Sequence, residues 1–182
     1  KNAKRQQSNG FSNINNAGKN ISRKSKIRMY ETIIRPVVTY ASETWTLNKQ
    51  DEMKLETWER KILRKIFGGV KSTEGEWRRR TNQEVMNLYR RPRITQKIRA
   101  QRIRWLGHIT RMPGQRIAKR VLEEGRGEKR RRGRPRKKWL EEVQKDLKAN
   151  GVKNWKSVVT DRKRWKQITA TIEFKGLEGL QR

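Results

Sequence analysis

Positive charge constrains the fold of this chain more than any other feature of its sequence. Among 182 residues, Lys and Arg number 49 while Asp and Glu number 18, so the formal net charge is +31. Leu, Ile, Val and Phe together make up about one fifth of the chain, close to the composition at which a highly charged chain stops folding. We therefore expect helices with small cores, segments that become ordered only on a polyanion, and a nucleic-acid partner.

Cysteine is absent, which excludes disulfides and any zinc site that uses thiolate ligands. No apolar run approaches the roughly 18 residues that a membrane-spanning helix requires, so we expect no membrane partner. No signal-peptide pattern opens the chain. The sequence begins at Lys1, and its first methionine, Met29, lies inside an expected helix, so we interpret the chain as a fragment of a longer protein.

Apolar residues recur at spacings of three and four through most of the chain. This periodicity predicts an all-α fold with two small helical groups joined by basic, partly disordered linkers. No internal repeat and no convincing run of alternating strand residues is present. We divide the sequence into a loose segment (1–20), two helical regions (21–69 and 70–124), a basic linker (125–138), a C-terminal helical pair (139–170) and a tail (171–182).

Local signals predict where the helices begin and end. Pro36 is expected to interrupt a helix, because proline lacks the N–H and disfavours helical backbone in the preceding residue. Asn48 is expected to cap a helix that ends at Gly68-Gly69. Thr81 and Glu84 have the spacing of a capping box. Near the C-terminus, the stripe of apolar residues predicts one helix over residues 154–168.

Seven tryptophans are many for a chain this polar. They could stack on bases, which contributes roughly 1–3 kcal/mol per base, or fill small helical cores. Trp45 and Trp77 remain open because the periodicity around them is poor. We favour a core role for the five that lie on helical stripes: Trp58, Trp105, Trp139, Trp155 and Trp165.

Side chains for catalysis or metal binding are scarce. His108 is the one histidine, and a lone histidine without cysteine is a poor metal-site candidate. The acidic pairs Asp51-Glu52, Glu123-Glu124 and Glu141-Glu142 lie on or beside helices, where adjacent residues do not face each other, so no two-metal site is expected. The residues therefore indicate a binding module without a cofactor and without chemistry of its own.

Five stretches occur in a fixed order and carry a family resemblance: KIRMYETIIRPVVTYASETWTL, DEMKLETWERKILRKIFG, RIRWLGHITRMP, GRPRKKWLEEVQKDL and DRKRWKQI. Together, from about Ile21 to Ile168, they resemble the C-terminal third of endonuclease–reverse transcriptases encoded by animal non-LTR retrotransposons. The resemblance implies that the first two stretches, within residues 21–69, belong to the thumb that grips the template–primer duplex. The third and fourth stretches belong to the family's basic C-terminal extension.

The same resemblance implies roles for individual residues, and the sequence also departs from the family's pattern. Four basic residues of the thumb would lie near phosphates, namely Lys24, Lys26, Arg28 and Arg35, while Tyr30, Trp45 and Trp58 would hold the thumb together. The family's polymerase acids form an Asp-Asp motif on the palm, and this sequence contains no Asp-Asp. Mg²⁺ is therefore expected only in the palm, and the rest of the parent polymerase is an expected partner.

The run KRRRGRPRKKW (129–139) allows three interpretations. It could contact an A·T minor groove like an AT-hook, bind phosphates without sequence preference while serving as a nuclear-import signal, or form a solvated basic loop. We favour the second, because generic electrostatics requires no special geometry. Including the basic helix before this run, the further candidate nucleic-acid-binding residues are Arg99, Arg102, Arg104, Arg130, Arg131, Arg132, Gly133, Arg134, Pro135, Arg136, Lys137 and Lys138.

These observations predict a nucleic-acid-binding fragment of a non-LTR retrotransposon reverse transcriptase that lacks the catalytic palm. It would bind RNA, DNA or both through phosphates, in the nucleus, with a possible cytoplasmic RNP stage. The alternative is a stand-alone basic protein that binds chromatin or an RNP, and a third interpretation is a degenerate relic that folds poorly.

Overall fold

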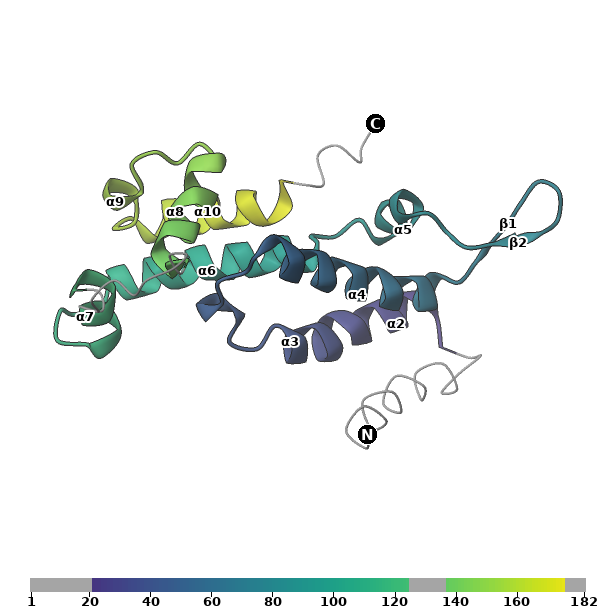
Figure 1. The fold of residues 1–182 in the computed structure, drawn as a ribbon, viewed down its shortest axis with the longest axis horizontal. Coiled ribbons are helices and arrows are strands. Elements are labelled where there is room, and N and C mark those ends of the chain that lie inside the picture. The colour runs from purple at the N-terminus through teal and green to yellow at the C-terminus, as the bar shows by residue number, and fades with distance from the viewer. Residues whose placement is uncertain (1–20, 125–136, 176–182) are drawn as a thin grey trace, which may run out of the picture. The chain divides into compact units, whose positions relative to one another are not determined.

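The computed structural model describes residues 21–124 and 137–175, and its helices confirm the all-α class (Figure 1). In these ranges the exception is an antiparallel pair of two-residue strands, β1 (Val70–Lys71) and β2 (Trp77–Arg78). The chain folds as two compact units. Among described residues, unit 1 comprises 21–38 and 57–90, and unit 2 comprises 39–56, 91–124 and 137–175. Each unit combines non-contiguous stretches, and the boundaries drawn from composition stay predictions.

Unit 1 begins with one continuous helical run in place of the interruption expected at Pro36. The run contains α2 (Arg23–Met29), the π-helical turn η1 (Tyr30–Ile34) and α3 (Arg35–Val38). Arg35 has helical dihedral angles, and its N–H bonds to the carbonyl of Tyr30 in the wider π turn. That turn comes directly before a proline that cannot donate a hydrogen bond and whose ring crowds the preceding turn. The expected break is therefore wrong, and the π turn accommodates the proline.

The core of unit 1 lies between this run, the second half of α4 (Lys49–Phe67) and α5 (Asn82–Tyr89). The hydroxyl of buried Tyr30 donates to the carboxylate of buried Glu59 at 2.8 Å. Burial and this carboxylate raise the pKa of Tyr30 above its ordinary value. The buried members of the core are Tyr30, Ile62, Leu63, Ile66, Phe67, Val85, Met86 and Tyr89.

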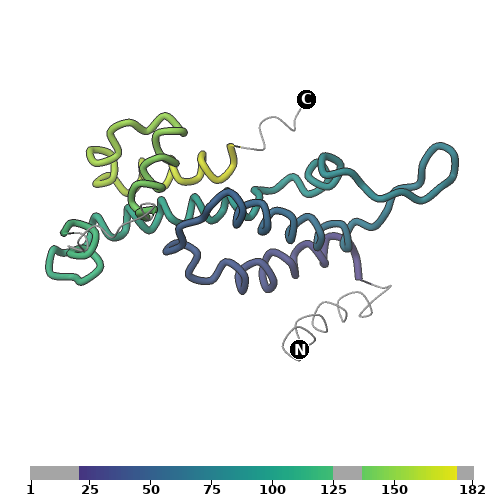
Figure 2. The backbone as a smooth tube through the Cα atoms, in the orientation of Figure 1, coloured from purple at the N-terminus to yellow at the C-terminus, as the bar shows by residue number. Residues whose placement is uncertain are grey.

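The predicted caps are confirmed. The side chain of Asn48 accepts from the backbone N–H of Asp51 at 2.8 Å at the start of α4, and the helix ends at Gly68, whose φ of 73° suits glycine. Thr81 and Glu84 form both bonds of a capping box at the start of α5. Between α4 and α5 the chain forms the β1–β2 hairpin (Figure 2).

Unit 2 is built around α6 (Ile94–Thr110), against which α8 (Trp139–Ala149) and α10 (Arg162–Phe174) pack (Figure 1). Unit 2 also contains the first part of α4, up to Glu56, and the shorter helices η2 (Ser42–Thr44), α7 (Ile117–Glu124) and α9 (Trp155–Val158). The buried residues of its main apolar cluster are Ile103, Leu106, Val143, Leu147, Val159, Trp165 and Ile172.

A glycine–tryptophan contact joins α6 to α10. A Cβ on Gly107 would lie 2.1 Å from Nε1 of Trp165, so only glycine lets the indole lie this close to the α6 backbone. The indole N–H donates to the carbonyl of Ile103 at 3.1 Å, which satisfies the polar atom of a buried ring. This contact explains why the RWLGH stretch contains a glycine in the middle of a helix.

The single helix expected over residues 154–168 is instead two helices. Asp161 separates α9 from α10, and its carboxylate accepts from the backbone N–H groups of Lys163 and Arg164 at 2.8 and 3.1 Å. This is an N-cap, which starts a new helix. Helix α10 then runs to Phe174, into the stretch expected to be a tail.

The tryptophans expected in cores are all wholly or partly buried, but to different extents. Trp165 is buried, and Trp139 and Trp155 pack against the same cluster of unit 2. Trp58 packs against the core of unit 1. Partly buried Trp105 lies beside the ring of His108, with 5.3 Å between ring centroids.

Candidate nucleic-acid interface

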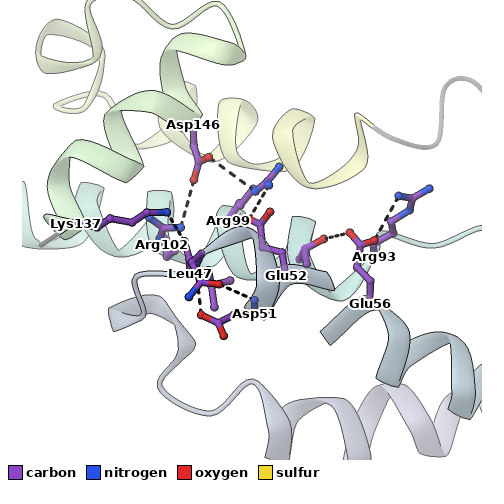
Figure 3. A network of polar contacts seen from close by, with 11 residues as sticks. Leu47, Asp51, Glu52, Glu56, Arg93, Arg99, Arg102, Lys137 and Asp146 are labelled. Atoms are coloured by element: carbon purple, nitrogen blue, oxygen red, sulfur yellow. Dashed lines mark hydrogen bonds and ion pairs between the residues drawn. The ribbon is translucent and has the colours of Figure 1, made fainter. Parts of the chain in front are cut away.

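Two of the α6 arginines predicted to bind nucleic acid are held by carboxylates within unit 2 (Figure 3). Arg99 pairs with Glu52 at 2.7 Å and lies 3.9 Å from Asp146, while Arg102 lies 3.6 Å from the other oxygen of Asp146. Arg102 is only 2% exposed. Burial raises the pKa of Asp146, although the two arginines oppose the shift. These guanidinium groups stabilise the packing of α8 on α6, so we do not assign them to a surface that binds phosphates.

Other basic residues of unit 2 have weaker attachments. The side chain of Arg104 is more than half exposed and lies 3.4 Å from Glu173. Lys137 donates to the carbonyl of Leu47 at 3.3 Å, and Lys138 lies 3.6 Å from Glu141. All three remain at the surface and available to a phosphate.

The predicted thumb residues of unit 1 divide in the same way. Lys24 and Arg28 are exposed on α2, and Lys26 is half-buried. Arg35 is buried, donates to the hydroxyl of Tyr89 at 2.9 Å and lies over the ring of Tyr30, 5.8 Å from its centroid. Arg35 therefore contributes to the core of unit 1, and we leave it out of the candidate surface.

A second basic surface of unit 1 was not among the predicted sites. It combines the outer face of α4 with the hairpin, and we call it the α4–hairpin surface. Half-buried Arg64 donates to the carbonyl of Arg80 at 3.1 Å and also bonds to Asn82, so it ties the end of the hairpin to α4. The pKa of Arg64 is lowered, first by desolvation and then by the charges of Arg79 and Arg60. Around Arg64, the exposed cations of this surface are Lys61, Lys65, Lys71 and Arg79.

The sequence contains part of the signal for this surface. Lys61, Arg64 and Lys65 recur along the face of α4 opposite its apolar stripe, which is readable from helical periodicity. The hairpin is not readable in this way, because its strands are only two residues long and show no alternation. What places Arg79 close to Arg64 is therefore a tertiary contact.

A single carboxylate fixes the hairpin to α5. Both terminal guanidinium nitrogens of Arg78, Nη1 and Nη2, donate to the carboxylate of Glu84, at 3.0 and 2.6 Å. The same carboxylate accepts from the backbone N–H of Thr81 at 2.7 Å. The bonds from Arg78 and then from Thr81 lower the pKa of Glu84 to about 2. Glu84 therefore holds strand β2 and caps α5 at once.

Unit 2 has a basic cluster at the start of α10. Arg162, Lys163, Arg164 and Lys166 are exposed, and in the described part of the chain none of them takes part in an ion pair. Arg111 lies nearby and donates to the carbonyl of Val159 at 2.7 Å; burial and then the charge of Arg162 lower its pKa. This cluster brings cations together, and the carboxylate beside it, that of Asp161, already accepts from two backbone N–H groups of α10.

The rest of the basic run predicted to bind nucleic acid lies outside the described residues. This applies to Arg130, Arg131, Arg132, Gly133, Arg134, Pro135 and Arg136. Over 21–124 and 137–175, no group of three His, Cys, Asp or Glu side chains is placed to hold a metal ion. No helix in these ranges is both long enough and apolar enough to cross a membrane.

Similarity to known proteins is limited but informative. No protein-family model matches the chain, and no solved structure matches it. The chain is similar to an uncharacterized transposon-derived protein of Caenorhabditis elegans, with 26% identity over 151 residues that cover 79% of this chain and 53% of the relative. The chain thus spans about half the length of that relative. The similarity is consistent with a transposon origin of the chain.

Proposed function

We propose that this chain is a nucleic-acid-binding part of a non-LTR retrotransposon reverse transcriptase, comprising thumb and basic C-terminal extension. The ordered resemblance of five stretches supports the family, and similarity to a transposon-derived protein supports the context. The chain would grip template–primer or target DNA while a separate palm carries out polymerisation.

The observation that carries the proposal is a contrast between acidic and basic side chains: several carboxylates bond within the chain, while two groups of cations stay exposed. Glu59 serves the buried hydroxyl of Tyr30, Asp146 faces the buried Arg102, and Glu84 holds Arg78 and a helix cap. These three carboxylates are thus committed to contacts within the chain. The cations of the α4–hairpin surface and of the start of α10 stay at the surface. Beyond the effect of desolvation, the charge of Arg79 acts on Arg64, and that of Arg162 acts on Arg111. Like charges held together repel, and an external polyanion relieves that repulsion.

Phosphate is the anion that best fits these side chains. Guanidinium groups bind phosphate oxygens through paired N–H donors, and lysines add mobile point charges. Such contacts position a strand without reading its sequence. On this proposal the chain has no sequence-reading element of its own in the described residues and depends on backbone contacts for affinity.

The remaining expectations follow from the same proposal. The isolated chain would have no polymerase activity, and Mg²⁺ would act only in the palm of the parent enzyme. The partners would be RNA, DNA and the rest of that enzyme, and the site of action would be the nucleus after a cytoplasmic RNP stage. A primer-extension assay on the purified chain is expected to give no product.

Salt dependence tests the proposal directly. The dissociation constant of the full chain should be measured by fluorescence anisotropy for a duplex DNA, an RNA–DNA hybrid and a single-stranded RNA of equal length. With six to ten phosphate contacts, affinity is expected to fall by about 10³ to 10⁵ between 50 and 200 mM salt. Failure to bind any of the three probes at 50 mM salt, or binding that ignores salt, would overturn the proposal.

A further inference from the structure

One large aromatic side chain of unit 1 is exposed in an unusual position. Trp77 lies on β2 and is 75% exposed, whereas tryptophans in folded proteins are on average highly buried. The residue opposite it in the antiparallel register is Lys71, which is also exposed. An indole that the fold leaves in water, next to a cation, is available to a ligand with a flat apolar face.

The strand that carries the indole is nevertheless anchored. One edge of the ring lies beside the backbone of Gly69, where a Cβ would lie 3.4 Å from Cε3 of Trp77 and 3.1 Å from the carbonyl oxygen of Arg78. The residue after Trp77 is fixed by the two bonds from Arg78 to Glu84. The carbonyl of Arg80 is fixed by Arg64. The backbone on either side of Trp77 is therefore anchored, which reduces the entropy cost of ordering the hairpin on binding.

The charges around Trp77 favour a polyanion on one side of the hairpin. Towards α4 lie Arg64 and Arg79, which are close enough for Arg79 to lower the pKa of Arg64. The hairpin loop carries the carboxylates of Glu74 and Glu76 instead. A nucleic-acid strand would therefore reach Trp77 from the side of Lys71 and Arg79 and avoid the two loop carboxylates.

We propose that Trp77 stacks on an unpaired base of a single-stranded nucleic acid, while the exposed side chains of Arg79 and Lys71 bind the flanking phosphates. The inference rests on the proposed function and adds a base-binding residue to it. Aromatic side chains beside a basic groove are the usual means of binding single strands without sequence preference. A strand without bases separates stacking on Trp77 from phosphate contacts alone.

The test uses the full chain and two probes with the same number of phosphates. One probe is a labelled twelve-nucleotide oligothymidylate, and the other is an abasic strand of equal length. Trp77→Ala is expected to weaken binding to oligothymidylate by about 5- to 150-fold, which corresponds to the stacking of one base. Binding of the abasic strand is expected to change little. Trp77→Phe should retain most of the affinity, and Tyr40→Ala, at an 82% exposed tyrosine, is the matched control and should have no effect.

Intrinsic fluorescence gives a second measurement that does not depend on how well Trp77→Ala folds. Oligothymidylate is expected to quench the fluorescence of the wild-type chain more than that of Trp77→Phe, because a stacked base quenches the indole of Trp77. The abasic strand should produce no such difference. Equal quenching in both proteins would overturn the inference.

The outcomes separate this inference from the proposed function. If the wild-type chain binds the duplex or hybrid of the salt titration but neither of these single strands, the inference alone fails. If it binds none of the probes in either experiment, the proposed function fails as well. If the wild-type chain binds both probes and Trp77→Ala binds them equally well, the inference alone fails. Equal weakening by Trp77→Ala on both probes would assign Trp77 a structural role in the hairpin and would also overturn base stacking.

Discussion

Helix α6 in unit 2 and the α4–hairpin surface in unit 1 are both rich in arginine but use it in opposite ways. On α6, Arg99 and Arg102 face Glu52 and Asp146, and the buried guanidinium of Arg102 is part of the core. On the α4–hairpin surface, Arg79 is close enough to Arg64 to disfavour its charge, and the neighbouring residues are further cations. The number of arginines therefore does not tell which of them are structural, whereas the positions of the carboxylates do.

Removing the carboxylate of the α6 network should have the largest effect. Asp146→Ala is expected to lower the free energy of unfolding by about 3–5 kcal/mol, because it leaves the buried charge of Arg102 without a counter-ion. Urea denaturation followed by circular dichroism measures this. The double variant Arg102→Leu/Asp146→Leu is the control and should be near wild-type stability, since apolar side chains can replace a buried pair. A wild-type midpoint for Asp146→Ala would contradict a structural role of this pair.

The contact between α6 and α10 should show the next largest effect. Gly107→Ala is expected to destabilise the chain by about 1–3 kcal/mol, because the added methyl group overlaps the buried indole of Trp165. Thermal unfolding detects the change. Gly114→Ala is a suitable control, since a Cβ at Gly114 meets no atom within 4 Å. Equal midpoints for the two variants would show that the indole can move aside freely.

Neutralising the α4–hairpin surface should affect binding and leave stability unchanged. Lys65→Gln/Arg79→Gln is expected to alter the free energy of unfolding by no more than about 0.5 kcal/mol, as for exposed substitutions generally. The slope of log affinity against log salt should fall by about 2, because each of the two removed cations would otherwise neutralise one phosphate.

The matched control for that variant removes the same charge from cations that already have a carboxylate partner. Arg120 lies 3.4 Å from Glu124, and Lys145 lies 3.3 Å from Glu142. Arg120→Gln/Lys145→Gln should therefore leave the salt slope closer to that of the wild-type chain. The same reduction in both double variants would mean that net charge alone decides affinity, without a localised surface.

Acid titration should show the smallest effect and concerns the attachment of the hairpin. The folded pKa of Glu84 is about 2, below its ordinary value of 4.5, so the folded state favours the carboxylate. This contribution to stability is complete above pH 4.5 and is lost as pH falls towards 2. The Glu84→Gln variant lacks this contribution at every pH. The difference in the free energy of unfolding between the wild-type chain and Glu84→Gln should therefore narrow as pH falls from 4.5 towards 2. A difference that is constant with pH would contradict the contact between Arg78 and Glu84.

Local signals were sufficient for several parts of the fold. The caps at Asn48 and Thr81 and the end of α4 at Gly68 depend on atoms within a few residues, so the sequence predicted them correctly. The expectation at Pro36 was wrong because a π turn accommodates the proline. The start of α10 was missed because the cap at Asp161 interrupts an apolar stripe that continues through it.

The candidate site was less predictable than the fold. Arg35 and Arg102 look like solvent-exposed cations in the sequence, and they become core residues through partners 54 and 44 positions away, Tyr89 and Asp146. Trp77 shows the reverse case, since a large aromatic residue is left exposed by a hairpin with no periodicity. Whether such a side chain is buried or exposed depends on residues distant in the chain, and hydrophobic periodicity does not reveal those contacts.

Composition and periodicity alone were enough to establish a helical chain with no thiolate chemistry and a large excess of positive charge. They also established most helix ends, because caps and helical stripes are short-range effects. Which arginines became structural and which stayed available for phosphate followed from packing, since a guanidinium is buried only where a carboxylate or hydroxyl from a distant segment meets it. The same packing left the indole of Trp77 in water and buried that of Trp165 against Gly107.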